Sequence, residues 1–303
     1  MTELTLFQRK IAEFLPDISL KCNEPLARHT SFRIGGPAEV MAFPNSADQL
    51  SQLLQAAKEL AVSPKILGAG TNVLAPDEGV EGLVICLKDA LSGMEQLTDT
   101  SIRVHAGVTM TRAALFAAGL GLSGLEFAHG IPGTVGGGVY MNAGAYGGEI
   151  CQICTQVAVM DMDSNQRLLS NEEMEFSYRN SRIQRENAIV LFADFQLQPQ
   201  PEVAIREKMQ QLQAKRRASQ PLDLPSAGSA FKRPANGFAA AMIDQAGLKG
   251  FQIGGAAVSE KHAGFVVNLG GATAADVRAL LSAVADKVEA IQGIRLEPEV
   301  RIW

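Results

Sequence analysis

Cysteine is scarce in this chain of 303 residues, which contains only four: Cys22, Cys86, Cys151 and Cys154. Four scattered cysteines are too few for the disulfide framework of a small secreted protein. Cys151 and Cys154 have C-x-x-C spacing, but no second pair completes a zinc site. The residues after Cys154 have strand character, and in a strand positions i and i+3 face opposite sides. We therefore expect buried structural thiols and no metal site.

An excess of positive charge is also missing. The chain has 27 lysines and arginines against 32 aspartates and glutamates, a net charge of −5. Nucleic-acid binding depends on a clustered basic face that neutralises phosphates. The nearest candidate, residues 215–217, is too short for this task. We expect no nucleic-acid partner.

Long apolar runs are absent as well. Charged or polar residues interrupt every apolar stretch well short of the roughly 20 residues that span a bilayer. The first residues lack the basic segment and apolar stretch of a signal peptide. With 47% hydrophobic residues the chain still has enough material for a well-buried core and two or three domains. We expect a cytoplasmic protein without membrane insertion.

Two common nucleotide-binding signatures are incomplete or missing. The loop that begins at Gly68 reads G-x-G-x-x-V and lacks the third glycine of the dinucleotide fingerprint. No Walker sequence is present. Predicted strands and helices follow one another without regular alternation. This order favours an α+β architecture over a doubly wound sheet.

Glycine, in contrast, is abundant, with 29 residues, and two loops concentrate it: residues 68–72 and residues 126–148. Glycine lacks Cβ, which lets a ligand approach the main chain. Successive N–H groups in such loops form a concave nest for an anion. A tight turn needs only one or two glycines, so this alternative stays open for residues 68–72 alone but explains the longer segment poorly. Two such loops predict a large, phosphate-bearing cofactor.

The apolar pattern also predicts several elements of the C-terminal third. Thr273 is expected to cap a long amphipathic helix. Apolar segments predict strands over residues 251–258 and 294–303. Turn-forming residues predict a linker over residues 198–201 and a long loop over 220–234.

Further motifs are spread over nearly the whole chain. In chain order, with the glycine loops included, they are residues 29–36, the Gly68 loop, the Gly130 segment, and residues 177–181, 228–232, 239–247, 261–265 and 296–301. Together these motifs resemble the UDP-N-acetylenolpyruvoylglucosamine reductase family. Each alone is weak, but their joint order is specific. The chain is similar to the shorter subclass, which lacks an inserted substrate-capping loop.

The resemblance implies an α+β protein. Its FAD-binding fold would be of the p-cresol methylhydroxylase type, with two α/β subdomains, followed by a C-terminal α+β substrate-binding domain. The expected first subdomain covers residues 1–60 and is completed by residues 294–303. The second covers residues 61–199, and the substrate-binding domain covers residues 200–293.

The resemblance also implies non-covalent FAD whose pyrophosphate meets the glycine loops. The expected cofactor contacts are Gly68, Ala69, Gly70, Thr71, Asn72, Gly130, Ile131, Pro132, Gly133, Thr134, Gly136 and Asn142. NADPH would deliver hydride to FAD, and UDP-N-acetylglucosamine enolpyruvate would then take its place. One site serving both ligands in turn explains why no separate NADPH motif appears. The product would be UDP-N-acetylmuramate, for peptidoglycan synthesis.

Three side chains match catalytic positions of the family: Arg179, Ser229 and Glu299. Ser229 would donate a proton to C2 of the enolpyruvyl group. Arg179 would pair with the substrate carboxylate and stabilise the enolate. Glu299 would assist as a protonated or strongly hydrogen-bonded carboxyl group on the last strand. Without the resemblance, the ordinary interpretations are a turn serine, a surface ion pair and a solvated charge on an edge strand.

Candidates for sugar or phosphate contacts are Lys232, Arg233, Asn236, Lys261 and His262. For each of them a solvated face or a local hydrogen bond is an equal alternative. Family members often carry asparagine at the position of Arg233, so this contact stays open.

Two other functions compete with the reductase. One is a different flavin oxidoreductase of the same fold, such as a sugar oxidase with FAD attached through His or Cys. No histidine here has an obvious attachment setting. The other is a non-catalytic module that binds nucleotide sugars, which would have no use for the long glycine segment.

Overall fold

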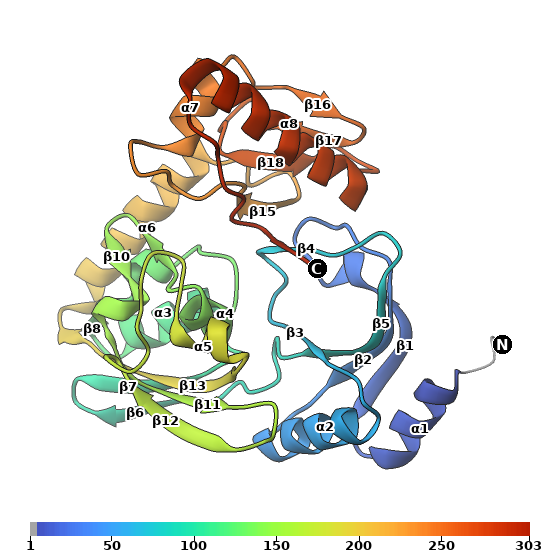
Figure 1. Ribbon diagram of the computed structural model, residues 1–303. Helices are drawn as coiled ribbons and strands as arrows, with labels where there is room; N and C mark the ends of the chain where they lie inside the picture. The colour runs from blue at the N-terminus through green and yellow to red at the C-terminus, as the bar shows by residue number, and fades with distance from the viewer. Residues whose placement is uncertain (1–4) are drawn as a thin grey trace. The chain divides into compact units, whose positions relative to one another are not determined.

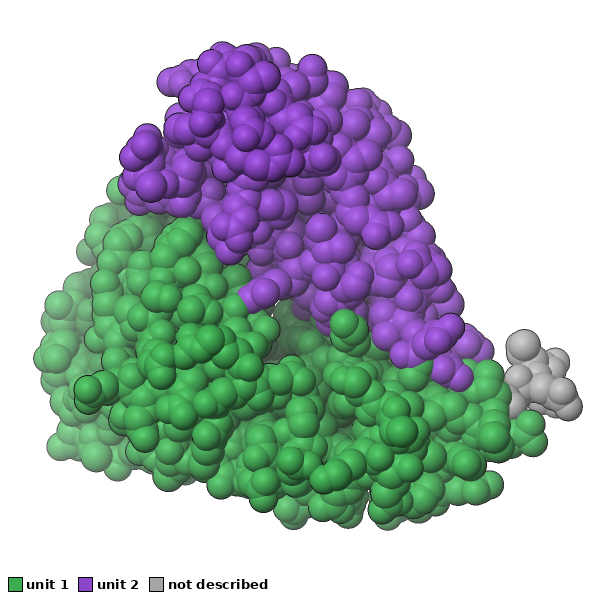
Figure 2. Space-filling model, in the orientation of Figure 1, with its two compact units in different colours: residues 1–22, 40–69, 82–215 green, residues 23–39, 70–81, 216–303 purple. Residues whose placement is uncertain are grey.

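The computed structural model describes residues 5–303 (Figure 1), which divide into two compact units (Figure 2). Unit 1 comprises Met1–Cys22, Val40–Ala69 and Gly82–Lys215. Unit 2 comprises Asn23–Glu39, Gly70–Glu81 and Arg216–Trp303. Both units are discontinuous in sequence and are defined by contacts. The three-part division expected from the sequence stays a prediction.

A five-stranded antiparallel sheet forms one half of unit 1. Its order is β12 (Gln166–Ser170), β11 (Cys154–Met160), β13 (Ile189–Gln196), β7 (Ser101–His105) and β6 (Met94–Thr98). Ile102 and Val104 alternate with more exposed residues along β7 and are fully buried. Figure 1 shows the helices that lie over one face of this sheet: α3 (Met110–Gly119), α4 (Val135–Tyr140) and α5 (Arg182–Glu186).

A second sheet has the order β1 (Ser19–Pro25), β2 (Pro37–Phe43), β5 (Val80–Cys86) and β3 (Lys65–Leu67), with β3 parallel to β5. The helices of the first residues are α1 (Leu6–Phe14) and α2 (Ala47–Glu59). Leu50, Leu53 and Leu54 on one side of α2 are buried because they recur at helical spacing.

The remaining elements before residue 220 are short strand pairs, 3-10 helices and one long helix. The strand pairs are β8 (Leu122–Ser123) with β14 (Gln198–Pro199), and β9 (Gly144–Ala145) with β10 (Gly148–Glu149). The 3-10 helices are η1 (Leu26–Arg28), η2 (Glu126–Ala128) and η3 (Ile150–Gln152). The chain passes from unit 1 to unit 2 within α6 (Glu202–Ser219).

Unit 2 is built on a four-stranded antiparallel sheet. Its order is β15 (Ser226–Ser229), β18 (Phe265–Asn268), β17 (Ala256–Val258) and β16 (Gln252–Ile253). The helices α7 (Ala239–Gln245) and α8 (Ala274–Gln292) pack beside each other on it (Figure 1). Two further short strands, β4 (Val73–Leu74) and β19 (Arg301–Ile302), pair in parallel.

Four predictions from the sequence are wrong in detail, and non-local pairing or a turn explains each. The expected linker 198–201 contains β14, which pairs with β8. The expected loop 220–234 contains β15, which pairs with β18. The expected strand 251–258 is a hairpin, because Gly254 turns the chain with φ 53°. The expected strand 294–303 is reduced to β19 at its very end.

The helix expected after Thr273 is present as α8. The Thr273 hydroxyl accepts a hydrogen bond from the Asp276 N–H at 3.0 Å, and the Asp276 carboxylate accepts one from the Thr273 N–H at 3.0 Å. This reciprocal pair is a capping box, which satisfies two main-chain donors at the helix start.

Candidate functional site

The two glycine-rich loops meet within unit 1. A Cβ atom on Gly68 would lie 2.8 Å from Oγ1 of Thr134, so the contact leaves no space for a side chain at position 68. Gly136 is equally close to its neighbours, with its N–H donating to the Ala106 carbonyl at 2.9 Å. A Cβ there would lie 2.9 Å from the Ala106 Cβ. Glycine at these positions therefore serves close main-chain approach.

The main chain of these loops presents donors as well as space. Among the residues that the structure describes, none accepts a hydrogen bond from the N–H groups of Gly68, Ala69, Gly133 and Thr134. The Gly130 N–H, in contrast, donates to Thr111 Oγ1 at 3.2 Å, and the Ile131 N–H donates to the Ala128 carbonyl at 3.0 Å. Adjacent N–H groups without internal acceptors suit an anion. The residues present thus fit the pyrophosphate of a dinucleotide cofactor.

The second half of the Gly68 loop belongs to unit 2. Gly70 has φ 62°, and a Cβ there would lie 2.1 Å from the His29 carbonyl oxygen. Its own carbonyl accepts a hydrogen bond from the Ser31 N–H at 3.0 Å. Asn72 donates its side-chain amide to the Glu299 carbonyl at 3.2 Å, and the Asn72 carbonyl accepts from the Arg301 N–H at 2.9 Å. This loop therefore fixes the main chain on both sides of Val300.

Ser229 and Glu299 are brought onto neighbouring segments of unit 2. The Glu299 N–H donates to the Ala230 carbonyl at 2.9 Å, and the Lys232 N–H donates to the Glu297 carbonyl at 2.8 Å. An antiparallel bridge between residues 231 and 298 lies between these bonds. Ser229 is exposed and Glu299 is half-buried. Glu299 therefore lies in this pairing and not on the closing strand, where the sequence had placed it.

Arg179 lies in a tight turn of unit 1. The N–H groups of Ser177 and Asn180 each donate to the other residue's carbonyl at 3.1 Å. Arg179 itself has φ 54°, in the left-handed region, and its guanidinium lies 5.1 Å from the ring centre of Tyr178. The nearby Arg182 forms an ion pair with Glu186.

Asn142 uses its amide for internal hydrogen bonds. Its side chain, 2% exposed, donates to the Ser177 carbonyl at 3.1 Å and to Glu149 Oε2 at 3.2 Å. Its oxygen accepts from the Cys151 N–H at 3.0 Å. The sequence had placed Asn142 among the cofactor contacts. In the structure its bond to Ser177 connects it to the turn that carries Arg179. No local sequence pattern predicts this bond.

The five candidate substrate contacts lie in two loops of unit 2. Lys232 forms an ion pair with Glu297, and the Arg233 guanidinium stacks 4.0 Å from the ring centre of Phe238. Asn236 is exposed in the same loop. In the loop between β17 and β18, the Lys261 ammonium donates to the Arg217 carbonyl at 2.6 Å.

His262, in the same loop as Lys261, makes mainly local contacts. Its Nδ1 accepts a hydrogen bond from the Gly264 N–H at 3.1 Å, and its ring packs edge-on against Phe265 at 5.0 Å. Burial lowers the pKa of His262. A neutral imidazole with an occupied Nδ1 fits a loop-ordering residue.

All four cysteines are free thiols: Cys86 and Cys154 are buried, Cys151 is half-buried and Cys22 is exposed. Cys151 lies in η3 and Cys154 opens β11, so the argument from two positions on one strand does not apply. Burial raises the pKa of Cys154 to about 12 and also raises the pKa of Cys151. No group of His, Cys, Asp and Glu side chains in residues 5–303 is arranged to hold a metal ion.

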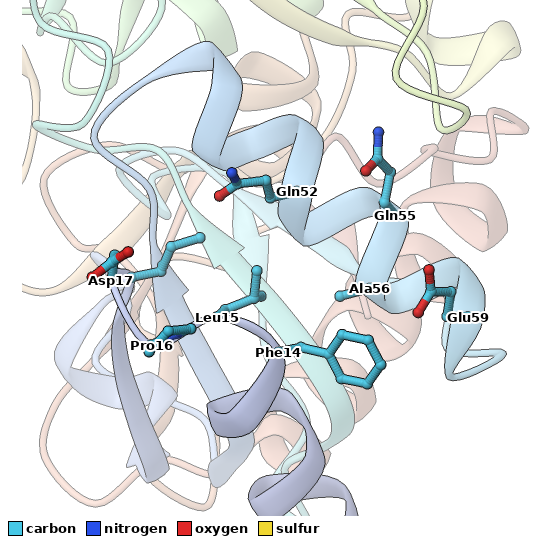
Figure 3. A pocket seen from close by; sticks show the side chains of 9 residues that line it. Phe14, Leu15, Pro16, Asp17, Gln52, Gln55, Ala56 and Glu59 are labelled. Atoms are coloured by element: carbon cyan, nitrogen blue, oxygen red, sulfur yellow. The ribbon is translucent and has the colours of Figure 1, made fainter.

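A shallow pocket lies on unit 1 between the end of α1 and α2 (Figure 3). Figure 3 shows Phe14 and Leu15 near Ala56, with Gln52 and Glu59 on the same helix. It contains none of the residues that the sequence singled out. Of the helices that the structure describes, none has the length and apolar character needed to cross a bilayer.

Comparisons with known proteins agree with this architecture. Residues 38–169 match the FAD binding domain family, and residues 220–303 match the C-terminal domain family of UDP-N-acetylenolpyruvoylglucosamine reductase. The reductase of that name from Latilactobacillus sakei is 46% identical, with 94% of this chain and 93% of the relative covered. The one from Caldanaerobacter subterraneus subsp. tengcongensis is 44% identical, with 97% and 96% covered.

The crystal structure of UDP-N-acetylenolpyruvylglucosamine reductase from Thermus caldophilus superposes with a TM-score of 0.77 at 32% identity, covering 94% of this chain and 98% of that one. The expected fold class, a flavin-binding region followed by a C-terminal domain, is thereby confirmed. The FAD cofactor is confirmed by the same matches. The chain belongs to the UDP-N-acetylenolpyruvoylglucosamine reductase family and is an FAD-dependent oxidoreductase.

Proposed function

We propose that this protein reduces UDP-N-acetylglucosamine enolpyruvate to UDP-N-acetylmuramate for peptidoglycan synthesis, with NADPH as the hydride source. The names of its relatives support the substrate. One structural observation carries the assignment to residues. The pairing of residues 230–232 with 297–299 places Ser229 and Glu299 on adjacent segments, as a shared reacting group requires.

When bound, FAD supplies the redox chemistry, passing a hydride from NADPH to C3 of the enolpyruvyl group. The protein must then hold the cofactor, orient the substrate and stabilise charge. The N–H groups of Gly68, Ala69, Gly133 and Thr134 are suited to the cofactor phosphates. The other proposed cofactor contacts are Gly70, Thr71, Asn72, Gly130, Ile131, Pro132, Gly136 and Asn142. The Asn142 side-chain amide also bonds to the Ser177 carbonyl.

Ser229 donates the proton that C2 requires. Ser229 is exposed at the end of β15. A serine hydroxyl is a weak acid, so it acts only when held at hydrogen-bond distance from the carbon it protonates. The bond between Glu299 N–H and the Ala230 carbonyl fixes the main chain next to it.

Arg179 and Glu299 stabilise the negative charge that develops on the substrate. A planar guanidinium pairs with a carboxylate through two parallel hydrogen bonds and stabilises the further negative charge of the enolate. Glu299 meets the same charge as a protonated or hydrogen-bonded carboxyl. Lys232, Arg233, Asn236, Lys261 and His262 remain candidates for the UDP and sugar groups.

The test is a visible spectrum recorded through both half-reactions. NADPH is added anaerobically to the purified protein, and the enolpyruvyl UDP-sugar follows. We expect the flavin absorbance to bleach and then to recover. Bleaching without recovery would contradict the proposed substrate, and failure of NADPH to bleach the flavin would contradict the hydride source. A protein that stays colourless after addition of FAD but binds UDP-sugars would favour a non-catalytic binding module.

A further inference from the structure

The helix α4 joins the Gly130 loop to the turn that carries Arg179. It begins after Thr134 and ends at Tyr140, whose carbonyl accepts two side-chain hydrogen bonds. Ser181 Oγ donates at 2.7 Å and Gln184 Nε2 donates at 2.6 Å. The last carbonyls of a helix have no intrahelical partner, so these two donors satisfy an acceptor that the helix leaves open.

The same Gln184 amide donates to the Arg179 carbonyl at 3.1 Å. One side chain thus connects the end of α4 with the main chain of Arg179. Gln184 is half-buried in α5, and Ser181 is fully buried. The turn is held at Ser177 by Asn142, at Arg179 by Gln184, and at Ser181 by its own hydroxyl.

The backbone of Arg179 explains why such anchoring matters. Its φ of 54° lies in the left-handed region, which is unfavourable for a residue with a side chain. A residue keeps this conformation only where its surroundings over-determine it. The conformation sets the direction in which the guanidinium leaves the main chain. Loss of the bond to the carbonyl would free the residue to relax.

We propose that Gln184 is a positioning residue for the reaction. Its amide, anchored on the Tyr140 carbonyl, holds the Arg179 carbonyl and thereby aims the guanidinium at the substrate carboxylate. The inference rests on the role proposed above for Arg179. Gln184 is better suited to a test than Asn142 or Ser181, because both of those are buried and Asn142 also bonds to Glu149 and Cys151.

The first variant is Gln184→Leu, with Gln166→Leu on β12 as the control for replacing a glutamine of unit 1. Gln166 is exposed. We expect Gln184→Leu to slow flavin reoxidation by the enolpyruvyl substrate roughly tenfold, the rate effect of losing about one hydrogen bond. Flavin reduction by NADPH should keep the parent rate, as should both half-reactions of Gln166→Leu. Equal effects of the two variants would overturn the inference.

The second variant, Gln184→Glu, separates positioning from simple packing. A carboxylate facing the carbonyls of Tyr140 and Arg179 repels both, whereas a protonated carboxyl donates one hydrogen bond. Two neighbouring acceptors raise the pKa of such a group. The reoxidation rate of Gln184→Glu, divided by that of the parent, should therefore rise as the pH falls toward about 5, approaching the ordinary glutamate range. A ratio that does not change with pH would contradict the role of the donor.

A readout without turnover completes the test. Amide hydrogen exchange of residues 177–181 should be faster in Gln184→Leu than in the parent, and unchanged in Gln166→Leu. Arg179→Ala, measured alongside, separates the two levels of the argument. If it slows reoxidation and Gln184→Leu does not, Gln184 has no positioning role and the proposed function stands. If Arg179→Ala leaves reoxidation unchanged, the role of Arg179 fails and the inference fails with it.

Discussion

Three side-chain amides donate to main-chain carbonyls at or beside residues with proposed catalytic roles. Asn72 donates to Glu299, Gln184 to Arg179, and Asn142 to Ser177 in the Arg179 turn. Such bonds fix the backbone from which a catalytic side chain projects. At the residue scale, therefore, precise placement comes from groups that do not react.

The Ser229 hydroxyl is the proposed proton donor, so its removal should affect only one of the two half-reactions. Ser229→Ala should leave flavin reduction by NADPH unchanged and slow reoxidation by the substrate roughly 10²–10⁴-fold, the usual contribution of a general acid. Rapid-mixing absorbance measurements follow each step. Ser226→Ala, in the same strand, serves as the control, because its hydroxyl has no proposed role. Equal slowing of both half-reactions by Ser229→Ala would remove the proton-donor assignment.

Glu299→Gln tests the carboxyl of Glu299, whose main chain pairs with Ala230, the residue after Ser229. The amide keeps the shape but cannot match both hydrogen-bonding states of a carboxyl. We expect the reoxidation rate to fall while the rate of reduction by NADPH stays within about twofold of the parent. Glu78→Gln, which changes another exposed carboxylate of unit 2, is the control. Transient kinetics equal to those of the parent would make Glu299 a bystander.

At the scale of elements, the start of α8 shows how a distant segment stabilises a helix within unit 2. In addition to the capping box, the Asp77 carboxylate accepts hydrogen bonds from the Ala274 N–H at 2.7 Å and the Ala275 N–H at 3.0 Å. These N–H groups lie at a helix N-terminus, where main-chain donors lack intrahelical partners and negative charge is favoured.

Asp77→Ala should lower the free energy of unfolding by about 1 kcal/mol, the typical loss for a helix-capping side chain. Urea denaturation followed by circular dichroism measures the difference. Glu78→Ala, which removes an adjacent exposed carboxylate, should change stability little. A midpoint for Asp77→Ala equal to that of the Glu78 variant would show that α8 does not need this cap.

The capping carboxylate of Asp276 makes part of this stability depend on pH. Hydrogen bonds from the main-chain N–H groups of Thr273 and then Gly255, followed by the Thr273 hydroxyl, lower the pKa of Asp276. The carboxylate therefore stabilises the folded state above its unfolded pKa of about 3.9. This contribution is lost as the pH falls through the lower folded value. The stability difference between parent and Asp276→Asn should shrink in that window, and a constant difference down to about pH 2 would contradict the assignment.

Local patterns predicted the elements that depend on nearby residues. The helix after Thr273 was predictable because its cap and its apolar stripe lie within one segment. The hairpin over residues 252–258 was not, because a turn at Gly254 interrupts a continuous apolar pattern. The closeness of the Ser229 and Glu299 segments depends on pairing between residues about seventy positions apart, which local patterns do not predict. The proposed roles of these two residues came from the resemblance and not from the local sequence.

At the scale of the whole molecule, similarity to the reductase family extends over nearly the entire chain. The glycine content signalled a phosphate-bearing cofactor, because glycine lets a ligand approach the main chain. It did not signal the contact between the two loops, where a Cβ on Gly68 would lie 2.8 Å from Oγ1 of Thr134. Each unit has its own hydrophobic cluster, built from segments that are distant in the sequence. Discontinuous units arise from contacts distant in sequence, which composition and periodicity do not encode.

Flavin attachment is a property of the whole protein that denaturation tests. Three of the four histidines have local partners: His29 bonds to Glu24, His105 packs on Phe192, and His262 accepts from Gly264. We therefore expect acid precipitation to release the flavin into the supernatant. Flavin absorbance that stays with the precipitated polypeptide would indicate a covalent bond and favour the oxidases of related fold.

The meeting of the two loops also restricts which mutations the gene can accumulate. Any replacement of glycine adds at least a Cβ atom. At position 68 that atom would lie 2.8 Å from a threonine oxygen that already accepts the Gly137 N–H, and at position 136 it would lie 2.9 Å from Ala106. Gly119, at the end of α3, has no atom within 4 Å of the same hypothetical Cβ. Neutral drift is therefore open at position 119, where alanine would also favour the helix, and closed at positions 68 and 136.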